Sequence, residues 1–492
     1  MMLLKRRNGE QSRTINPVKS RSAGISLKAE LFNRASSSMI NPSIFKTYDI
    51  RGKYPQDVNE RVFEALGQAF FDLTEAQEIV VGSDNRASSE KLRKSVIFAL
   101  SSRGAKVIDI GFCTTPAFYW AVCHFKAQAG LMVTASHLEK DFNGLKPVKS
   151  KAQVLTTEEI QDWKQITLNL DKKANSRIQA GEIIKKDIRD EYAADLRKHI
   201  NLDLKDLKIV MDAGNTVVGN YLPHIFKNTN LKTIALFWRL DSFFPNRGLD
   251  IKIARNRKAL VEKIKKEKAD LGFIWDGDAD RLYILDSQAQ VIDPSFVSAI
   301  IAKYLIAQSG RKKIVVEIRT SKVVGDEVAK AGGEIIVSQA WHTEIKTAMR
   351  KELQAIFGSE TSGHYIFKDF YCLDDGILAG IYFLNAISLE QKNLMEILKD
   401  FKSRYFIIEE TNFSIPNQEK GEQILEKIEK YYENKQGRFS KIDGLSIDFK
   451  DWRFNLRQSK TESVLRLNLE ADSQDLMEKK QKELSAIIQS RI

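Results

Sequence analysis

The chain has 492 residues, of which 43% are hydrophobic and 29% charged, so it is a globular protein too long for one core and should form three or four domains. No apolar run approaches the ~20 residues of a membrane helix, and no uninterrupted apolar stretch suggests a secretory signal. Three cysteines without a C-x-x-C pair (Cys113, Cys123 and Cys372) indicate a reducing compartment, which we expect to be the cytoplasm.

The net charge of +12 is unevenly distributed. Residues 1–40 contribute about half of it, and they show no sustained helical or strand periodicity, which predicts a disordered basic tail. Met39 is a plausible alternative start. The modest excess of positive charge in the rest of the chain suits a protein that binds phosphorylated small molecules as well as it suits one that binds nucleic acid. A nucleic-acid partner is therefore disfavoured, since it would depend on the tail alone.

From Phe45 onward, apolar runs of strand length alternate with helical patterns, which predicts an α/β fold. In 41–187, strands are expected at 78–82, 107–110 and 131–134; Asn59 should cap a helix over 60–73, and Ser88 and Gly104 should bracket another. The alternation restarts in 188–290 and again in 291–403, giving three similar α/β units. Residues 404–492 alternate differently, with helices near 423–433 and 476–488, and predict a smaller α+β domain.

The sharpest local signal is an acidic loop between two apolar runs, with Asp276, Asp278 and Asp280 at alternate positions. Carboxylates spaced in this way suit Mg²⁺ or Ca²⁺. An EF-hand loop is excluded because its sixth and twelfth positions would be Arg281 and Ser287. The competing interpretation is a solvated acidic turn.

A second loop places Ser136 and His137 after an apolar strand, with Lys146 close behind. Such a serine can be a nucleophile or a phosphate carrier, although a turn or helix cap is the commoner role.

Two further loops carry polar clusters. Glu360, Ser362 and His364 lie among glycines and offer hydrogen bonds to sugar hydroxyls. The other loop, before a C-terminal strand, suits a phosphate; its candidate ligands are Arg457, Ser459, Lys460 and Thr461.

Together, these four loops in this order resemble the α-D-phosphohexomutase superfamily, and most closely its phosphomannomutase/phosphoglucomutase branch. Residues 45–52 (FKTYDIRG), 212–215 (DAGN) and 244–246 (FPN) are similar to further markers of that branch. The resemblance runs from about Ile44 to Ala471. It implies four domains around a central cleft: three related α/β units and a smaller phosphate-binding domain.

The resemblance also implies a mechanism. Ser136 would carry a phosphoryl group and, with the three aspartates, bind one Mg²⁺ per chain. The phosphoryl group would pass to a hexose monophosphate, and the bisphosphorylated hexose, which also serves as activator, would turn end for end before returning its other phosphoryl group. The residues near the reacting oxygen would be Arg51, His137, Lys146, Arg281 and His364, with Lys146 and His364 as candidates for proton transfer. His342 matches a further family histidine near the sugar.

Several residues depart from the family pattern, and they lie in the working loops: Leu138, Glu139, Trp341, Ser359, Lys460 and Ser463. Because no residue that the chemistry needs is missing, altered substrate preference is a better inference than inactivity. The alternatives are a phosphoglucosamine mutase and a non-catalytic sugar-phosphate-binding paralogue. The preference between mannose and glucose, and the choice between monomer and small homo-oligomer, stay open at this stage.

Overall fold

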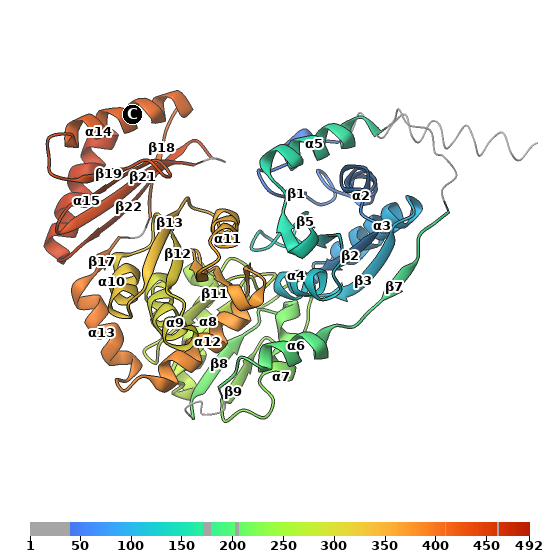
Figure 1. The fold of residues 1–492 in the computed structure, drawn as a ribbon, viewed down its shortest axis with the longest axis horizontal. Coiled ribbons are helices and arrows are strands. Elements are labelled where there is room, and N and C mark those ends of the chain that lie inside the picture. The colour runs from blue at the N-terminus through green and yellow to red at the C-terminus, as the bar shows by residue number, and fades with distance from the viewer. Residues whose placement is uncertain (1–39, 171–178, 202–205, 409, 460–461) are drawn as a thin grey trace, which may run out of the picture.

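The computed structural model describes residues 40–170, 179–201, 206–408, 410–459 and 462–492. Four β-sheets follow one another along this part of the chain, which confirms the predicted four-unit α/β class. The units form an arc, with the first and the fourth at its two ends (Figure 1). Residues 1–39 of the predicted 1–40 tail, and the residues Lys460 and Thr461, lie outside the described residues. Ile40, which the prediction placed in the tail, is buried in the core of the first unit. The exact domain boundaries stay predictions.

The first unit has a sheet of order β1-β5-β4-β2-β3-β7, with β6 beside β5. Asn59 caps α2 by accepting a hydrogen bond from the Val62 amide, as predicted. Ser88 precedes α3 but does not cap it; its hydroxyl instead accepts a hydrogen bond from Asn143 Nδ2 at 2.8 Å. The elements are η1 (Pro42–Ile44), β1 (Ile50–Lys53), α2 (Glu60–Thr74), β2 (Glu78–Ser83), α3 (Ser89–Ser102), β3 (Lys106–Phe112), α4 (Thr115–His124), β4 (Ala129–Val133), β5 (Phe142–Lys149), η2 (Ser150–Ala152), β6 (Gln153–Val154), α5 (Thr157–Leu168) and β7 (Ile183–Lys185).

The second and third units have sheets of order β11-β10-β8-β9 and β13-β12-β14-β15-β16. The second contains α6 (Arg189–Arg197), β8 (Lys208–Asp212), η4 (Val217–Asn220), α7 (Leu222–Ile225), β9 (Lys232–Leu236), α8 (Ala254–Glu267), β10 (Leu271–Trp275) and β11 (Leu282–Leu285). The third contains α9 (Pro294–Ser309), β12 (Lys313–Glu317), α10 (Lys322–Lys330), β13 (Glu334–Ser338), α11 (His342–Lys351), β14 (Ala355–Ser359), β15 (Tyr365–Phe367), η5 (Lys368–Phe370), β16 (Leu373–Asp374), α12 (Gly376–Leu389) and α13 (Leu394–Arg404).

Three of the predicted loops occupy equivalent places in the first three units. They are the serine loop, which contains Ser136, the acidic loop, which contains Asp276, and the sugar loop, which contains Glu360. Each joins a strand that pairs in parallel with its neighbour to an antiparallel partner: β4 to β5, β10 to β11, and β14 to β15. The carboxyl end of a strand in a parallel sheet is where α/β folds bind ligands. The repeated hairpin therefore brings the serine, acidic and sugar loops to corresponding edges of three sheets.

The fourth unit is an antiparallel sheet of order β17-β22-β21-β20-β19, with β18 also beside β22. Helices α14 and α15 contribute to its core. Its elements are β17 (Phe406–Ile407), β18 (Thr411–Ser414), α14 (Gln418–Tyr432), β19 (Arg438–Ser440), β20 (Leu445–Asp448), β21 (Trp452–Gln458), β22 (Val464–Ala471) and α15 (Gln474–Gln489).

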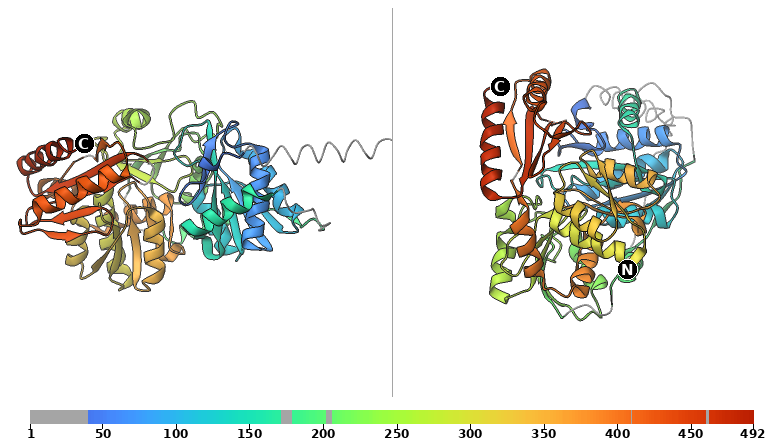
Figure 2. Two further views of the ribbon diagram at one scale, coloured as in Figure 1. Left: turned by 90° about the horizontal axis from the view of Figure 1, so that it is seen from above. Right: turned by 60° about the vertical axis from the view of Figure 1, so that its left-hand side comes forward.

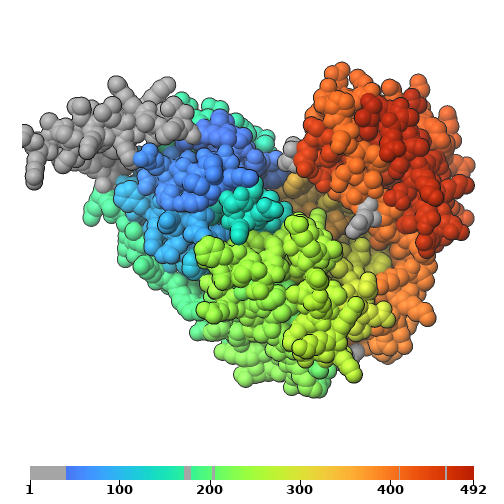
Figure 3. All heavy atoms as spheres, turned by 180° about the vertical axis from the view of Figure 1, so that it is seen from behind, coloured from blue at the N-terminus to red at the C-terminus, as the bar shows by residue number. Residues whose placement is uncertain are grey.

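Hydrophobic packing separates the fourth unit from the rest. One buried cluster continues from α4 through the second unit to α9 and α12, whereas the fourth unit has a core of its own. Polar contacts attach it to the third unit: Arg453 donates to the Ile318 and Thr320 carbonyls, and Glu470 accepts from the Lys322 amide. Figure 2 shows the red fourth unit as a separate body, and in Figure 3 the surface is indented between it and the blue first unit.

The described residues also bear on the expectations about membrane helices and about cysteines. Their helices include none long and apolar enough to cross a membrane. The three cysteines are free thiols, with Cys113 and Cys372 buried and Cys123 partly exposed.

Candidate active site

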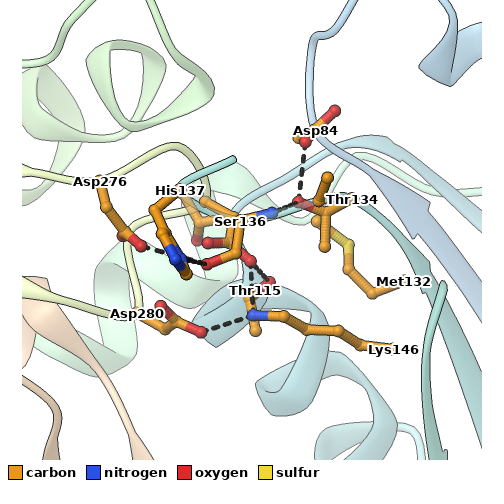
Figure 4. A network of polar contacts seen from close by, with 12 residues as sticks. Asp84, Thr115, Met132, Thr134, Ser136, His137, Lys146, Asp276 and Asp280 are labelled. Carbon is orange, nitrogen blue, oxygen red and sulfur yellow. Dashed lines mark hydrogen bonds and ion pairs between the residues drawn. The ribbon is translucent and has the colours of Figure 1, made fainter. Parts of the chain in front are cut away.

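Ser136 lies in a strained, enclosed turn directly after β4. Its φ of +53° falls in the left-handed region, and the residue is only 2% exposed. The Ser136 amide donates to Thr134 Oγ1 at 2.9 Å, and the Thr134 hydroxyl in turn donates to Asp84 Oδ2 at 2.7 Å. The turn is thus fixed by side chains of its own unit, and the serine hydroxyl faces the second unit (Figure 4).

Arg86 organises the rest of this loop and was missed by the sequence reasoning. Its guanidinium is buried, pairs with Asp84 at 2.9 Å, and donates to the carbonyls of Ser136, Leu138, Glu139 and Phe142. Residues 138 and 139, which depart from the family pattern, thus use their backbones to hold the loop. The position of Arg86 soon after β2 was the only sequence signal for this role.

The serine loop meets the acidic loop across the boundary between the first two units. Ser136 Oγ donates to Asp276 Oδ2 at 3.2 Å (Figure 4). The backbones approach so closely that a Cβ on Gly277 would lie 2.2 Å from the Ser136 carbonyl oxygen. Thr115, at the start of α4, adds a second link by donating to Asp278 Oδ2 at 2.5 Å.

The acidic loop has the oxygen atoms that a divalent cation requires. Asp276, Asp278 and Asp280 are each at most 1% exposed, and one carboxylate oxygen from each lies within 4.8 Å of the others. The Oδ1 atoms of Asp278 and Asp280 are buried without a hydrogen-bond partner among the described residues. Buried anionic oxygens without partners are costly, so these residues fit a hard cation, and a merely solvated turn is excluded.

Lys146 supplies part of the compensating charge. Its ammonium lies 2.7 Å from Asp278 Oδ2 and 2.6 Å from Asp280 Oδ2. Burial alone would lower the pKa of Lys146, but the two carboxylates outweigh burial and raise the pKa well above its usual value. Burial, and then the charges of Asp280 and Asp278, raise the pKa of Asp276 well above its usual value. One lysine therefore does not balance three carboxylates.

Further cationic and imidazole groups surround Ser136. Arg51 donates to the Ala135 carbonyl at 2.7 Å, and His137 Nδ1 lies 3.4 Å from Ser136 Oγ. Burial, and then Arg281 and Arg51, lower the pKa of His137 well below its usual value, which leaves this imidazole neutral. Arg281 Nε donates to His364 Nε2 at 2.9 Å.

Asp374 joins the two predicted histidines of the third unit and was not found from the sequence. His342 Nδ1 donates to Asp374 Oδ2 at 2.7 Å, and His364 Nδ1 lies 2.9 Å from the same oxygen. The two rings stack with centroids 4.3 Å apart, while Lys346 Nζ lies 2.6 Å from Asp374 Oδ1. Because Nδ1 of each ring faces the carboxylate, each Nε2 is directed away from Asp374.

The sugar loop is held by Arg319, which the sequence reasoning also missed. The guanidinium contacts Glu360 at 3.3 Å, Glu317 at 2.6 Å and Glu410 of the fourth unit at 3.2 Å. Burial alone would raise the pKa of Glu360, but His364 and Arg319 outweigh it and lower that pKa to about 2. Ser362 Oγ is buried without a partner among the described residues, so this loop keeps one hydroxyl for a ligand.

Arg457 is the last residue but one of β21, in the fourth unit. It is only 5% exposed, and its Nε and Nη1 atoms are buried without a hydrogen-bond partner in the described part of the chain. Burial, followed by the like charge of Arg319, lowers the pKa of Arg457. Ser459 accepts a hydrogen bond from the Glu462 amide. Unsatisfied guanidinium donors beside another guanidinium indicate an anion site.

The structure therefore brings together Ser136, the three aspartates and the predicted cations and histidines, drawn from three units. Arg457 belongs to the fourth unit and lies within electrostatic range of Arg319. A carboxylate cluster that fits a cation, a buried hydroxyl beside it, a loop with an unpaired hydroxyl and a buried guanidinium with unpaired donors are the kinds of group with which an enzyme holds a phosphorylated sugar.

Four family models match almost the whole described chain. They are the phosphoglucomutase/phosphomannomutase alpha/beta/alpha domains I (residues 42–174), II (190–289) and III (293–405), and the C-terminal domain (410–487). The chain belongs to the phosphoglucomutase/phosphomannomutase family.

Individual relatives agree with this membership. A phosphomannomutase of Escherichia coli strain K12 is 31% identical over 87% of this chain and 94% of its own length. A phosphomannomutase of Methanocaldococcus jannaschii is 33% identical over 90% and 97%. The crystal structure of a phosphoglucomutase/phosphomannomutase family protein from Burkholderia thailandensis superposes with a TM-score of 0.83 and 26% identity, covering 92% of this chain and 98% of the other.

Proposed function

We propose that this chain is a Mg²⁺-dependent phosphohexomutase that interconverts hexose 6-phosphate and hexose 1-phosphate, with mannose, glucose or both as the hexose. The observation that carries the proposal is the hydrogen bond from Ser136 Oγ to Asp276 Oδ2. It places a buried hydroxyl directly beside a cluster of three carboxylates. Phosphoryl transfer depends mainly on positioning and on compensation of charge, and this arrangement provides both.

Asp276, Asp278, Asp280 and the Ser136 phosphoryl group would hold one Mg²⁺, which offsets negative charge on the phosphoryl group when it is bound. Lys146 and Arg281 add fixed positive charge around that position. Of the two groups expected to transfer protons, Lys146 is already paired with two carboxylates. We therefore assign proton transfer to His364 and keep Lys146 as a stabilising cation.

In the first step, a hydroxyl oxygen of the hexose monophosphate attacks the phosphorus on Ser136. The new P–O bond forms to the sugar while the bond between phosphorus and Ser136 Oγ breaks, and His364 Nε2 accepts the hydroxyl proton. Ser136 Oγ leaves as an alkoxide, whose charge the cation held by the three aspartates would offset until this oxygen attacks phosphorus again in the second step. Arg281 donates to that nitrogen in the described structure, so the sugar hydroxyl replaces Arg281 there. Asp374 keeps the opposite ring nitrogen protonated and so leaves the Nε2 lone pair available.

In the second step, the bisphosphorylated hexose presents its other phosphoryl group to Ser136. The P–O bond to the sugar breaks, the bond to Ser136 Oγ re-forms, and the proton returns to the sugar oxygen. Arg457, Ser459, Lys460 and Thr461 would bind the phosphate that is not reacting, while Glu360, Ser362 and His342 would bind sugar hydroxyls in both orientations. A bisphosphorylated hexose added from solution would phosphorylate Ser136 and act as activator.

The names of the relatives favour mannose phosphate among the substrates, since those from Escherichia coli and Methanocaldococcus jannaschii are called phosphomannomutases. The cytoplasm is the location we propose, because three free thiols suit a reducing compartment. Because all of the proposed catalytic groups belong to one chain, the protein can act as a monomer or as a small homo-oligomer.

The test is turnover with Mg²⁺ and a trace of hexose bisphosphate, comparing the 1-phosphates of mannose, glucose and glucosamine. We expect the first, the second or both to be converted to the 6-phosphate faster than the third. Preference for glucosamine 1-phosphate would favour the phosphoglucosamine mutase alternative, and no turnover of any substrate would favour a non-catalytic paralogue.

A further inference from the structure

A cavity of about 480 Å³ lies where the second, third and fourth units meet. Its wall includes Lys252, Arg319, Thr361 and Asn455. Arg319 and Thr361 belong to the surroundings of the sugar loop, and Asn455 lies on β21, the strand that also contains Arg457. The cavity therefore extends from the sugar loop towards the fourth unit, which carries the candidate anion site at Arg457.

The backbone of Lys252 is fixed on both sides. Its amide donates to Asp250 Oδ1 at 2.9 Å, and its carbonyl accepts from Arg257 Nη1 at 2.6 Å. Asn256 Nδ2 donates to the Asp250 carbonyl at 2.8 Å, and Ile251 is buried. A rigid loop thus presents a flexible, exposed lysine side chain at the cavity wall.

The ammonium of Lys252 is not committed to a carboxylate. Among the described residues, no ion pair within 4.0 Å involves it, whereas the neighbouring Arg319 pairs with three glutamates. The like charges of Arg281 and Arg319 repel the Lys252 ammonium, while the carboxylates of Glu360 and Glu410 act on it in the opposite direction. Because no carboxylate of the described residues holds it in an ion pair, this ammonium can pair with an arriving anion.

We propose that Lys252 retains the bisphosphorylated hexose while the intermediate turns end for end in the cleft. This inference rests on the proposed function. During the turn, the sugar must leave both the site at Ser136 and the phosphate site at Arg457, although it carries about −1.5 to −2 charges on each phosphate. An ammonium on a flexible stem holds a phosphate without the directional demand of a guanidinium, so it can follow a moving group.

The experiment begins with enzyme carrying a ³²P-labelled phosphoryl group on Ser136. This phosphoenzyme is mixed with limiting unlabelled glucose 1-phosphate or mannose 1-phosphate and with an excess of unlabelled hexose bisphosphate as a trap. Labelled bisphosphate free in solution is then compared with labelled hexose 6-phosphate. The variant is Lys252→Met, which keeps the stem and removes the charge. The matched control is Lys258→Met on α8, whose side chain is 77% exposed.

We expect Lys252→Met to raise the ratio of released bisphosphate to product by about tenfold, the order of effect of one close charge pair in a partly solvated site. Lys258→Met should leave the ratio as in the wild type, and Lys252→Arg should restore much of the retention. A wild-type ratio in Lys252→Met, or an equal rise in Lys258→Met, overturns the inference while leaving the proposed function intact. If the wild-type enzyme transfers label neither to bisphosphate nor to hexose 6-phosphate, the proposed function fails and the inference fails with it.

Discussion

Ser136 of the first unit and Asp276 of the second are joined by a hydrogen bond of 3.2 Å across the boundary between two sheets. Neither unit alone contains both the serine that is proposed to carry the phosphoryl group and the three carboxylates that are proposed to hold the cation. The equivalent hairpins β4–β5 and β10–β11 produce this contact by directing their loops towards each other. The reaction centre is therefore a property of how the units pack.

The acidic loop should require a divalent cation for stability as well as for turnover. Mg²⁺ is expected to raise the melting temperature of the wild type, because it offsets repulsion among three buried carboxylates, and EDTA should abolish turnover. Asp278→Asn should lose most of the stabilisation by Mg²⁺. Thermal melts with and without Mg²⁺ measure this independently of activity, and full turnover in chelator would refute the cation site.

Replacing Asp374 with Asn should lower kcat by about 10²-fold or more, within the range that positioned acid–base catalysis contributes. KM should change less than kcat, because the carboxylate acts through His342 and His364 and does not touch the substrate. In ¹⁵N spectra of the imidazoles, the protons of both rings should no longer be confined to Nδ1.

The matched control is Asp375→Asn. Asp375 is also buried, but its carboxylate accepts from the Tyr192 hydroxyl and from the amides of Ile377 and Leu378 in α12, and these hydrogen bonds within the described residues involve neither histidine. This change should lower stability and leave kcat per folded molecule and the imidazole spectra unchanged. Equal losses of kcat in the two variants would show that Asp374 has only a structural role.

Replacing Arg457 with Ala should raise KM and lower kcat together, since the same grip binds the distal phosphate and orients the sugar for transfer. Arg457→Lys should rescue only part of the loss, because an ammonium lacks the two-pronged geometry of the guanidinium. Inorganic phosphate should compete with the substrate much less in the alanine variant. The control is Arg438→Ala, which changes an exposed arginine of the same sheet. Unchanged KM and kcat in Arg457→Ala would show that the fourth unit does not bind the distal phosphate.

Replacing Arg86 with Met should destabilise the first unit by about 3–5 kcal/mol, because it leaves the Asp84 carboxylate buried without its partner. Four loop carbonyls also lose their donor. Urea unfolding monitored by tryptophan fluorescence measures the loss. Lys94→Met on α3 removes only an exposed pair with Glu90 and should cost less than about 1 kcal/mol. Similar midpoints for the two variants would contradict the role of Arg86.

The sequence predicted the four units because alternation of strand and helix patterns is a local property. The strand expected at 78–82 coincides with β2, and the helix capped by Asn59 coincides with α2, each to within one residue. The four loops were identified because each concentrates polar residues between apolar runs. Such signals need no knowledge of which segments meet in space.

The residues that position the site could not be predicted in the same way. Arg86 donates to carbonyls 50 to 56 residues away. Arg319 contacts Glu360 and Glu410, which are 41 and 91 residues away. Asp374 contacts His342, 32 residues away, and His364 on the other side of a strand pairing that only the fold sets. Ser88 looked like a helix cap, but tertiary packing offered its hydroxyl a different partner. Trp341, one of the residues that depart from the family pattern, has a φ of +97°, a conformation that costs a non-glycine residue about 1–3 kcal/mol.

The central claim is that Ser136 carries the phosphoryl group that reaches the sugar, and the most direct measurement follows that group in a single turnover. The wild type is phosphorylated with labelled hexose bisphosphate, mapped by peptide mass spectrometry, and mixed with unlabelled mannose 1-phosphate or glucose 1-phosphate. The account predicts a labelled phosphopeptide containing Ser136, loss of that label to the sugar at the rate of turnover, and neither labelling nor turnover in Ser136→Ala. Label on another residue, or turnover of Ser136→Ala close to that of the wild type, would contradict it.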